Sequence, residues 1–201
     1  MHSAHSWSEG PGVRAEHGGV RAVRSTLLCF GLQELRARNR IDDYRRALPV
    51  WAHETIFQAV AGVWLPIDVV MAHFGACESL GMSAQECFDI GGASGRRLSA
   101  SSLGALARMA TQVGASPSTV LAVYHRLWSR VFDGGVVDIT TVGPKEAIIA
   151  YRDLPFAKFA YCQHTLRGAN DSAFRLVAKT LYLRALPGNT DDSFALRLSW
   201  A

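Results

Sequence analysis

Apolar residues at helical spacing dominate the first half of the chain. They recur through Val20–Arg38, Glu54–Val63 and Ile67–Leu80, and Asp42–Ala47 is a polar connector or a short helix. Trp64-Leu65-Pro66 ends one helix and begins the next, because proline suits a first helical turn. The pattern therefore predicts that this half is all helix. The inward positions expected in the second stretch are Ile56, Phe57, Val60 and Val63.

The stretch from Ser116 to Tyr151 changes its period partway along. Ser116-Pro117 has the composition of a helix start. Gly134-Gly135 is expected to end this helix, and Val136–Val142 and Ala147–Tyr151 are predicted strands joined by a turn at Gly143–Glu146. The stretch is thus predicted to be one helix followed by a β-hairpin. The apolar positions that define the helix are Val120, Val123, Tyr124, Leu127 and Val131.

A second helix is expected after this hairpin. Asp153 can cap it, and Pro155 suits its first turn. Gly168 is expected to interrupt it, and Asp171–Ala178 to resume it. Its expected inward residues are Phe156, Phe159, Ala160 and Leu166.

The end of the chain alternates between apolar and polar positions. Leu181–Ala185 and Phe194–Trp200 have this alternation, which is typical of strands with one buried face, and Pro187-Gly188-Asn189 turns between them. The predicted fold class is α+β, with an N-terminal helical lobe packed on a four-stranded antiparallel sheet of ββαββ order. Residues 1–19 are expected to be a mobile tail and 20–201 a single domain, with 20–115 as the lobe and 116–201 as helix plus sheet.

Two patterns complete the expected lobe. Ser83 and Glu86 have the spacing of a reciprocal helix cap, which predicts a short helix there. Gly91–Gly95 is expected to be a hinge loop, since it lacks the Gly-Lys-Ser/Thr ending of a phosphate-binding loop. Ser101-Ser102 is expected to open another helix that Gly114 closes.

Composition narrows the class of protein. The 201 residues are 49% hydrophobic and 19% charged, which suits a compact globular chain. The formal charge is +4, but the arginines are scattered and not clustered as in nucleic-acid binders. No apolar run reaches membrane-spanning length, no signal peptide is recognised, and the four cysteines form no close pair. We therefore expect a cytoplasmic protein with reduced thiols and no membrane contact.

Candidate catalytic chemistry is sparse. His53-Glu54 begins like a zinc-protease motif, but the second histidine of that motif is replaced by Phe57. His73 and Cys77 lie one helical turn apart, with Cys87 near in sequence; they either hold a metal or line a core. His164 and Cys162 point to different helix faces. We expect no enzyme.

Several sequence features together resemble a known group of sensor domains. They are Trp64-x-Pro66, Glu86–Gly91 with its Ile-Gly ending, Leu127-Trp128 followed by Asp133-Gly134-Gly135, and Phe194–Trp200 closing the chain. This layout, from Leu27 to Trp200, resembles the haem–nitric oxide/oxygen-binding (H-NOX) domains and the related 4-vinyl-reductase-like sensor domains. It is most similar to short uncharacterised bacterial proteins that share the architecture.

The resemblance implies a haem site. In H-NOX domains the helix before the first hairpin carries the histidine that binds haem iron, and His125 lies on that helix here. A Tyr-x-Ser-x-Arg sequence after the second strand holds the haem propionates. This chain has Tyr151-Arg152-Asp153 at that place, so the tyrosine matches while the serine and arginine do not, and an aspartate would repel propionates.

A helix-turn-helix is an alternative interpretation of the middle of the chain. Leu106–Arg108, Gly114–Ser116, Ser118–Val120 and Tyr124–Leu127 resemble the winged-helix repressors, in which the hairpin would be the wing. The start of the second helix lacks Arg, Asn or Gln to recognise bases.

The sequence therefore favours a non-enzymatic sensor or regulatory domain in signalling. It is expected to bind a small apolar ligand or a partner protein, and a homodimer is compatible with the fold. The expected ligand pocket lies between lobe and sheet. The alternatives are a haem-based gas sensor using His125 and Tyr151, and a winged-helix DNA-binding regulator. The residues expected to line the pocket are Met71, Phe74, Leu121 and Trp128.

Overall fold

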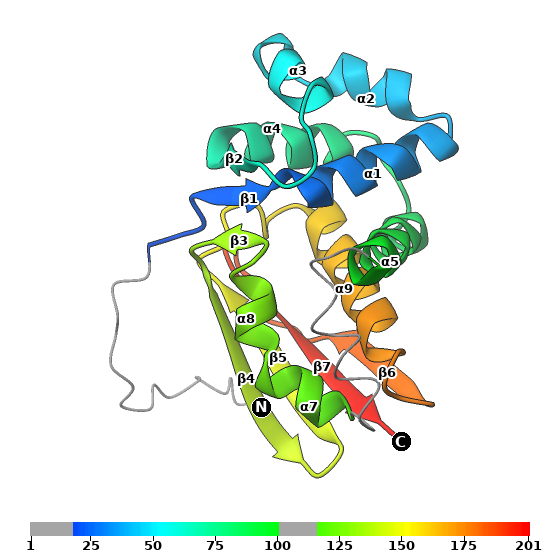
Figure 1. Cartoon of the computed structure of the whole chain (residues 1–201), viewed down its shortest axis with the longest axis vertical. Coiled ribbons are helices and arrows are strands. Elements are labelled where there is room, and N and C mark those ends of the chain that lie inside the picture. The colour runs from blue at the N-terminus through cyan, green and yellow to red at the C-terminus, as the bar shows by residue number, and fades with distance from the viewer. Residues whose placement is uncertain (1–17, 101–115) are drawn as a thin grey trace, which may run out of the picture.

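The computed structural model describes residues 18–100 and 116–201. A helical lobe lies at one end of the molecule and a four-stranded sheet at the other, and α9 runs from the lobe along the sheet (Figure 1). The helices of the lobe are α1 (Ser25–Ala37), α2 (Ile41–Ala47), α3 (Val50–Phe57) and α4 (Ile67–Glu78).

The first half of the chain is not all helix, as the sequence had suggested. A small antiparallel sheet of order β2-β1-β3 joins β1 (Ala22–Arg24), β2 (Trp64–Pro66) and β3 (Phe132–Asp133). Helical spacing extends back to Val20, but the backbone of β1 finds partners on both sides, and these distant hydrogen bonds decide its conformation. The small sheet connects the start of the lobe to the segment that leads into the hairpin.

The helix expected to reach Val63 ends at Phe57. Gly62 has φ +95°, and the backbone N–H of Ser25 donates to the Val63 carbonyl at 2.8 Å, so this loop is held by α1. Val60 is 68% exposed, so the prediction that it faces inward is wrong.

The glycines at 91–95 form helix and not a loop. They lie inside α5 (Ala84–Ala100), whose start is capped by Ser83 and Glu86 as predicted. Likewise Gly168 does not interrupt α9 (Ala160–Phe174). A Cβ on Gly91 would lie 1.9 Å from the Thr165 carbonyl oxygen, and one on Gly168 would lie 2.0 Å from the carbonyl oxygen of Phe88. The two glycines therefore allow the backbones of α5 and α9 to cross in direct contact.

The predicted helix before the hairpin is divided in two. The two helices are α7 (Pro117–Ala122) and α8 (Tyr124–Trp128), which meet at Val123. Ser116 and Thr119 cap the start of α7. Gly134 and Gly135 then adopt φ +91° and +68°, which only glycine adopts readily.

The four-stranded antiparallel sheet and its ββαββ order are confirmed. The strands β4 (Val136–Gly143), β5 (Glu146–Arg152), β6 (Leu181–Ala185) and β7 (Phe194–Trp200) are arranged β4-β5-β7-β6, with α9 between the two hairpins in sequence. Tyr151 pairs with Phe194 and Ile149 with Leu196, so alternate residues of β5 and β7 share one buried face. The α+β fold class is thus the one that the sequence predicted.

The segment between β5 and α9 differs from the prediction. Asp153 has φ +60° and does not cap a helix, because α9 begins only at Ala160. Phe156 is buried as expected, whereas Ala160 is exposed. The expected helix after Ser101 and most of the expected tail at 1–19 lie outside the described residues. Within residues 18–100 and 116–201, no helix is both long and apolar enough to cross a membrane.

Candidate functional site

The end of β5 faces α8, where the resemblance placed a haem ligand. His125 is exposed on this helix, and its neighbour Tyr124 turns toward the sheet. The hydroxyl groups of Tyr124 and Tyr151 are 2.8 Å apart. The structure therefore brings Tyr151 together with Tyr124 and not with His125.

Asn170 on α9 completes a closed set of hydrogen bonds with these two tyrosines. Tyr124 donates to Asn170 Oδ1 at 2.6 Å, and Asn170 Nδ2 donates to the Tyr151 hydroxyl at 2.9 Å. Since the Tyr124 proton is used on Asn170, the Tyr151 hydroxyl must donate to Tyr124. We call Tyr124, Tyr151 and Asn170 the Tyr–Tyr–Asn triad; it ties α8, β5 and α9 together.

Burial keeps both phenols of the triad protonated. It raises the pKa of Tyr124 to about 12, while the hydrogen bonds from Tyr151 and Asn170 partly oppose the shift. Burial also raises the pKa of Tyr151 well above its ordinary value, and the nearby Tyr124 adds to this. Neither phenol is poised to act as a base near neutral pH.

Aromatic rings fill the contact between lobe and sheet. Trp128 stacks on Phe132 with ring centroids 3.9 Å apart, and Phe74 of α4 stacks on Phe156 at 4.9 Å. Phe132 and Phe156 link the two pairs at 6.1 Å. Trp128 also lies 5.4 Å from the ring of Tyr151. We call these rings, with Phe194 stacked on Tyr151 at 4.7 Å, the ring stack.

The four residues of the predicted pocket all belong to the core, but two of them stand at different places along the ring stack. Phe74 and Trp128 are separated by Phe156 and Phe132. Leu121 is buried, and Met71 is half-buried against the core. Rings therefore occupy the space between Phe74 and Trp128 where the apolar ligand was expected.

These residues do not fit a haem between α8 and β5. A haem there needs an imidazole aimed at the iron and room for a flat macrocycle. The imidazole of His125 is exposed, and the ring of Trp128 and the hydroxyl of Tyr124 contact Tyr151 directly. In addition, the cation next to Tyr151, Arg152, is ion-paired with Asp138 of β4.

Two of the other described histidines, His53 and His73, form contacts within the lobe. His53 Nε2 donates to the Leu48 carbonyl at 2.9 Å, so the zinc-protease resemblance has no structural counterpart. His73 is 2% exposed; its Nδ1 lies 2.7 Å from the Tyr44 hydroxyl and its Nε2 lies 3.8 Å from Cys77 Sγ. His73 and Cys77 are thus together, as predicted, inside the core.

Burial sets the protonation of this pair. It lowers the pKa of His73 to about 3 and raises the pKa of the Cys77 thiol far above its ordinary value, so both are neutral near neutral pH. Cys87 directs its thiol to the Met82 carbonyl at 3.9 Å. Over the described ranges, no group of three or more His, Cys, Asp or Glu side chains could hold a metal ion.

The side chains of the remaining pair, His164 and Cys162, differ in burial and form no hydrogen bond with each other among the described contacts. Cys162 is fully buried, whereas His164 is half-buried. Burial and Arg167 lower the pKa of His164.

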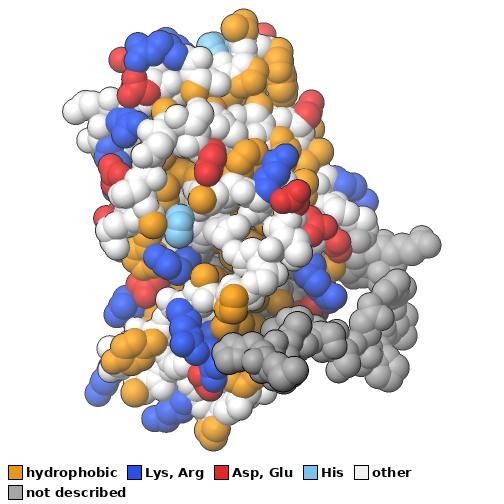
Figure 2. Space-filling model, turned by 180° about the vertical axis from the view of Figure 1, so that it is seen from behind, with side chains coloured by type: hydrophobic (Ala, Val, Ile, Leu, Met, Phe, Trp, Pro, Cys, Tyr) orange, Lys and Arg blue, Asp and Glu red, His pale blue; other side chains and the backbone are white. Residues whose placement is uncertain are grey.

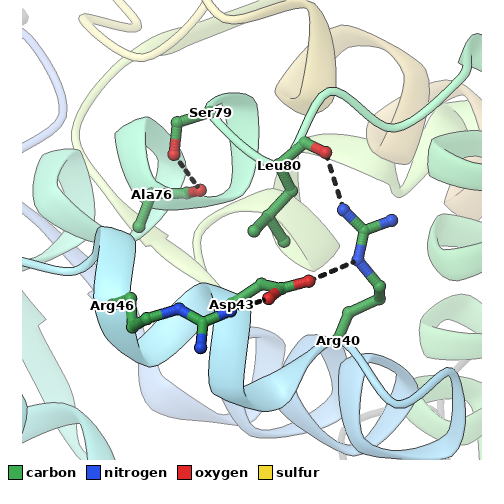
Figure 3. A network of polar contacts seen from close by, with 6 residues as sticks. All are labelled: Arg40, Asp43, Arg46, Ala76, Ser79 and Leu80. Atoms are coloured by element: carbon green, nitrogen blue, oxygen red, sulfur yellow. Dashed lines mark hydrogen bonds and ion pairs between the residues drawn. The ribbon is translucent and has the colours of Figure 1, made fainter.

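Two hollows lie away from the ring stack. One of about 400 Å³ is bordered by α1, α5 and α9, with Phe88, Arg96 and Leu176 among its lining residues. The other, of about 430 Å³, lies where α2 meets the end of α4 (Figure 3). There Arg40 bonds both Asp43 and the Leu80 carbonyl, and Arg46 pairs with Asp43. None of the four predicted pocket residues lines either hollow.

The nucleic-acid alternative gains no support from the described surface. Figure 2 shows one face, on which basic side chains are interspersed with acidic and hydrophobic ones. The would-be recognition helix is divided into the six-residue α7 and the five-residue α8, and α8 turns Trp128 into the core. Part of the helix-turn-helix pattern, including Leu106–Arg108, lies outside the described residues.

The sequence interpretation missed two members of this site. Asn170 had no distinguishing signal, since asparagine within a helix is usually a surface residue. Tyr124 belongs to the predicted apolar stripe, which indicates no partner for its hydroxyl group. The signal that could have found it is that a buried tyrosine needs a hydrogen-bond partner, and Tyr151 was the available one.

Comparison with known proteins supports the fold and goes no further. No known protein family matches the chain, and no curated protein matches it in sequence. A point mutant of an H-NOX protein from K. algicida, in its Fe(II) unliganded form, is similar with TM-score 0.60 and 8% identity, over 89% of this chain and 96% of that one.

Two further solved structures agree. An oxygen-binding H-NOX domain related to soluble guanylate cyclases is similar with TM-score 0.54 and 13% identity, over 88% of this chain and 94% of that one. A structure from work on modulating haem redox potential through porphyrin distortion gives TM-score 0.56 and 12% identity, over 88% and 99% of the two chains. At such identities the similarity shows the fold alone, and the chain has an H-NOX-like fold.

Proposed function

We propose that this protein is a regulatory domain of the sensor type, which acts by binding and not by catalysis. The observation that carries the proposal is the H-NOX-like fold, which spans 88% of this chain and nearly the whole of an oxygen-binding H-NOX domain. In the Tyr–Tyr–Asn triad, both hydroxyl protons are donated to another member of the triad. Such groups hold elements together and leave no nucleophile or base for a reaction.

Of the two binding partners that the sequence favours, a partner protein is better supported than an apolar ligand. The ring stack occupies the predicted ligand pocket. Large hydrophobic side chains are exposed at α3 and in the loop before β2: Val50 is 83% exposed, Trp51 58% and Val60 68%. Exposed apolar side chains mark contact surfaces where they form a contiguous patch, and Val50 and Trp51 are adjacent in sequence.

A native mass spectrum and an absorbance spectrum of the purified full chain test the proposal together. We expect a 21.9 kDa chain that carries a stoichiometric second component, either another protein chain or a small molecule, and that dissociates on unfolding. A bare monomer, whose unfolding midpoint is unchanged by cell extract fractions and by small apolar compounds, would count against a binding role.

Gas sensing through haem is the second candidate, because one similar structure is an oxygen-binding H-NOX domain. In that case His125 would bind iron and Tyr151 would hold a propionate. The purified protein would then show a Soret band that His125→Ala abolishes. The site residues as packed argue against this candidate, as described above.

A further inference from the structure

We infer that this H-NOX-like domain is built to be closed without haem: its own rings and a hydrogen-bonded triad occupy the space between α8 and β5. The packing of these rings and of the triad is independent of the proposed regulatory role.

The first observation is that Tyr151 has no proton left for an outside anion. Its hydroxyl donates to Tyr124, Tyr124 donates to Asn170, and Asn170 donates back to Tyr151. Tyr151 is completely buried. A carboxylate that took this hydroxyl proton would leave the hydroxyl oxygen of Tyr124 without its donor inside the core, which is costly.

The second observation is that the ring stack is continuous from the sheet to the lobe. Consecutive centroids are 3.9 to 6.1 Å apart, so each ring contacts the next. The members come from α4, α8, β3, β5, β7 and the segment before α9, so both the lobe and the sheet contribute. Their rings, all at most 9% exposed, are Phe74, Trp128, Phe132, Tyr151, Phe156 and Phe194.

The third observation concerns the groups that would hold the two ends of a haem. His125 is exposed on α8, and it is the neighbouring Tyr124 that faces the sheet and bonds Tyr151. Arg152, the cation beside Tyr151, already pairs with Asp138. Neither end of the presumed site is free to bind, so a haem could enter only by dismantling the core.

The main test uses the unmodified protein. The full chain is titrated with haemin under oxidising and reducing conditions, and the Soret absorbance, the induced circular dichroism of the haem and the unfolding midpoint are recorded. We expect no saturable band at one equivalent, no induced dichroism and an unchanged midpoint. A ligand that binds only the native state raises the midpoint. One-to-one binding with induced dichroism and a raised midpoint overturns the inference.

His125→Ala is the matched variant for this titration. Because His125 is exposed, the variant should fold normally and titrate as the wild type does. Loss in this variant of a band present in the wild type would identify His125 as the iron ligand and would also overturn the inference. Neither result bears on whether the domain binds a partner protein, so the two proposals are separable.

A second test asks whether the rings act as filler. Trp128→Ala removes one ring from the stack, and a dry apolar cavity can bind a molecule of the missing shape. We expect indole to raise the unfolding midpoint of Trp128→Ala in a saturable manner and to leave the wild type unchanged. If Trp128→Ala is as stable as the wild type and indole has no effect, the stack does not fill the core and the inference fails. If this variant does not fold, the haemin titration of the wild type still decides whether the core is closed to haem.

Discussion

The ring stack and the crossing of α5 with α9 solve the same problem in opposite ways. Between lobe and sheet, large rings fill the available space, with Trp128 and Phe132 only 3.9 Å apart. At the helix crossing, side chains are removed so that two backbones touch, and a Cβ on Gly91 would lie 1.9 Å from a carbonyl oxygen of α9. The two regions meet through α9, because Gly168 lies against α5 and Asn170, two residues later, donates to Tyr151 of the ring stack.

The difference teaches which changes each region tolerates. A ring-filled contact suffers when atoms are taken away, because the cavity left behind is not refilled. A glycine crossing suffers when a single carbon is added, because backbone cannot rotate aside as a side chain does. Substitutions that remove atoms should therefore destabilise the ring stack, and substitutions that add atoms should destabilise the glycine crossing. The size of each loss in the free energy of unfolding tests the comparison.

The largest effect is expected from Phe156→Ala. Phe156 is completely buried and contacts both Phe74 and Phe132, so its loss breaks the link between the two halves of the ring stack. We expect a loss of about 3–5 kcal/mol in the free energy of unfolding, as for other buried Phe→Ala changes. Urea unfolding followed by circular dichroism measures it. Phe159→Ala, a half-buried ring three residues on, is the matched control and should cost clearly less.

Gly91→Ala should come next. The added methyl would meet the Thr165 carbonyl group, whose carbon and oxygen lie 2.6 and 1.9 Å from it, and the helices must separate. Alanine favours a helix by about 1 kcal/mol over glycine, but overpacking of this kind costs about 3 kcal/mol, so a net loss remains.

Gly92→Ala is the control at the next position of the same helix. Its methyl would lie 3.5 Å from the Arg96 guanidinium and 3.7 Å from the Gly168 carbonyl oxygen, which is ordinary contact. We expect it to be neutral or slightly more stable than the wild type in the same urea experiment. Equal effects of the two substitutions would show that the crossing does not depend on close backbone contact.

These glycines also show how far the sequence could lead. The strand pairs, the ββαββ order and the H-NOX-like layout follow from local patterns: alternation in β5 and β7, and turn residues such as Gly143-Pro144 and Pro187-Gly188. The run at 91–95 has the local composition of a loop. Its helical state depends on α9, which lies more than 60 residues later, and no local pattern reports that partner.

The candidate site is harder to predict from the sequence for the same reason, because it depends on contacts between distant segments. Tyr151 and the apolar character of Phe74 and Trp128 could be recognised in the sequence, but not whether a space between them is open or filled. That depends on Phe132 and Phe156, which reach it from β3 and from the segment before α9. The choice between His125 and Tyr124 depends on helical phase, and the break at Val123 turns α8 away from the phase of one continuous helix.

Acid should weaken the lobe end of the ring-filled region. His73, in edge contact with Phe74, has its pKa lowered by burial from 6.5 to about 3. The unfolded chain then binds a proton more readily than the native one between these values, so stability is complete above about pH 6.5 and falls as pH falls. We expect a loss of about 2 kcal/mol between pH 6.5 and 4.5. Unfolding curves across this range measure it.

His73→Gln should flatten this pH dependence, whatever its own cost at neutral pH. His164→Gln is the necessary control, because the pKa of His164 is also lowered, by burial and by Arg167, and contributes with the same sign. The carboxylates of Glu86 and Glu146, whose pKa values are lowered by hydrogen bonds, lose their contributions only below this window. An unchanged slope in His73→Gln would show that His73 is not the group that titrates.

The smallest effect is expected from Tyr151→Phe, which removes one hydroxyl group and leaves the ring stack intact. Asn170 Nδ2 keeps its second acceptor, the Leu166 carbonyl at 2.7 Å, but Tyr124 loses the proton it accepts. We therefore expect a loss of about 1 kcal/mol in the free energy of unfolding. Because the hydrogen bond from Tyr151 lowers the pKa of Tyr124, its loss should raise that pKa further above the ordinary value, which ultraviolet titration of the phenols detects.

Tyr182→Phe is the matched control for Tyr151→Phe, since Tyr182 is 70% exposed on β6, and it should leave stability unchanged. A double-mutant cycle with Tyr124→Phe isolates the contact itself, and we expect a coupling of about 0.5–1 kcal/mol. Zero coupling would mean that the two hydroxyls are merely adjacent and that Tyr151 has a proton to offer elsewhere. In that case the triad would no longer argue against an anion at this place, and only the rings would keep the core closed.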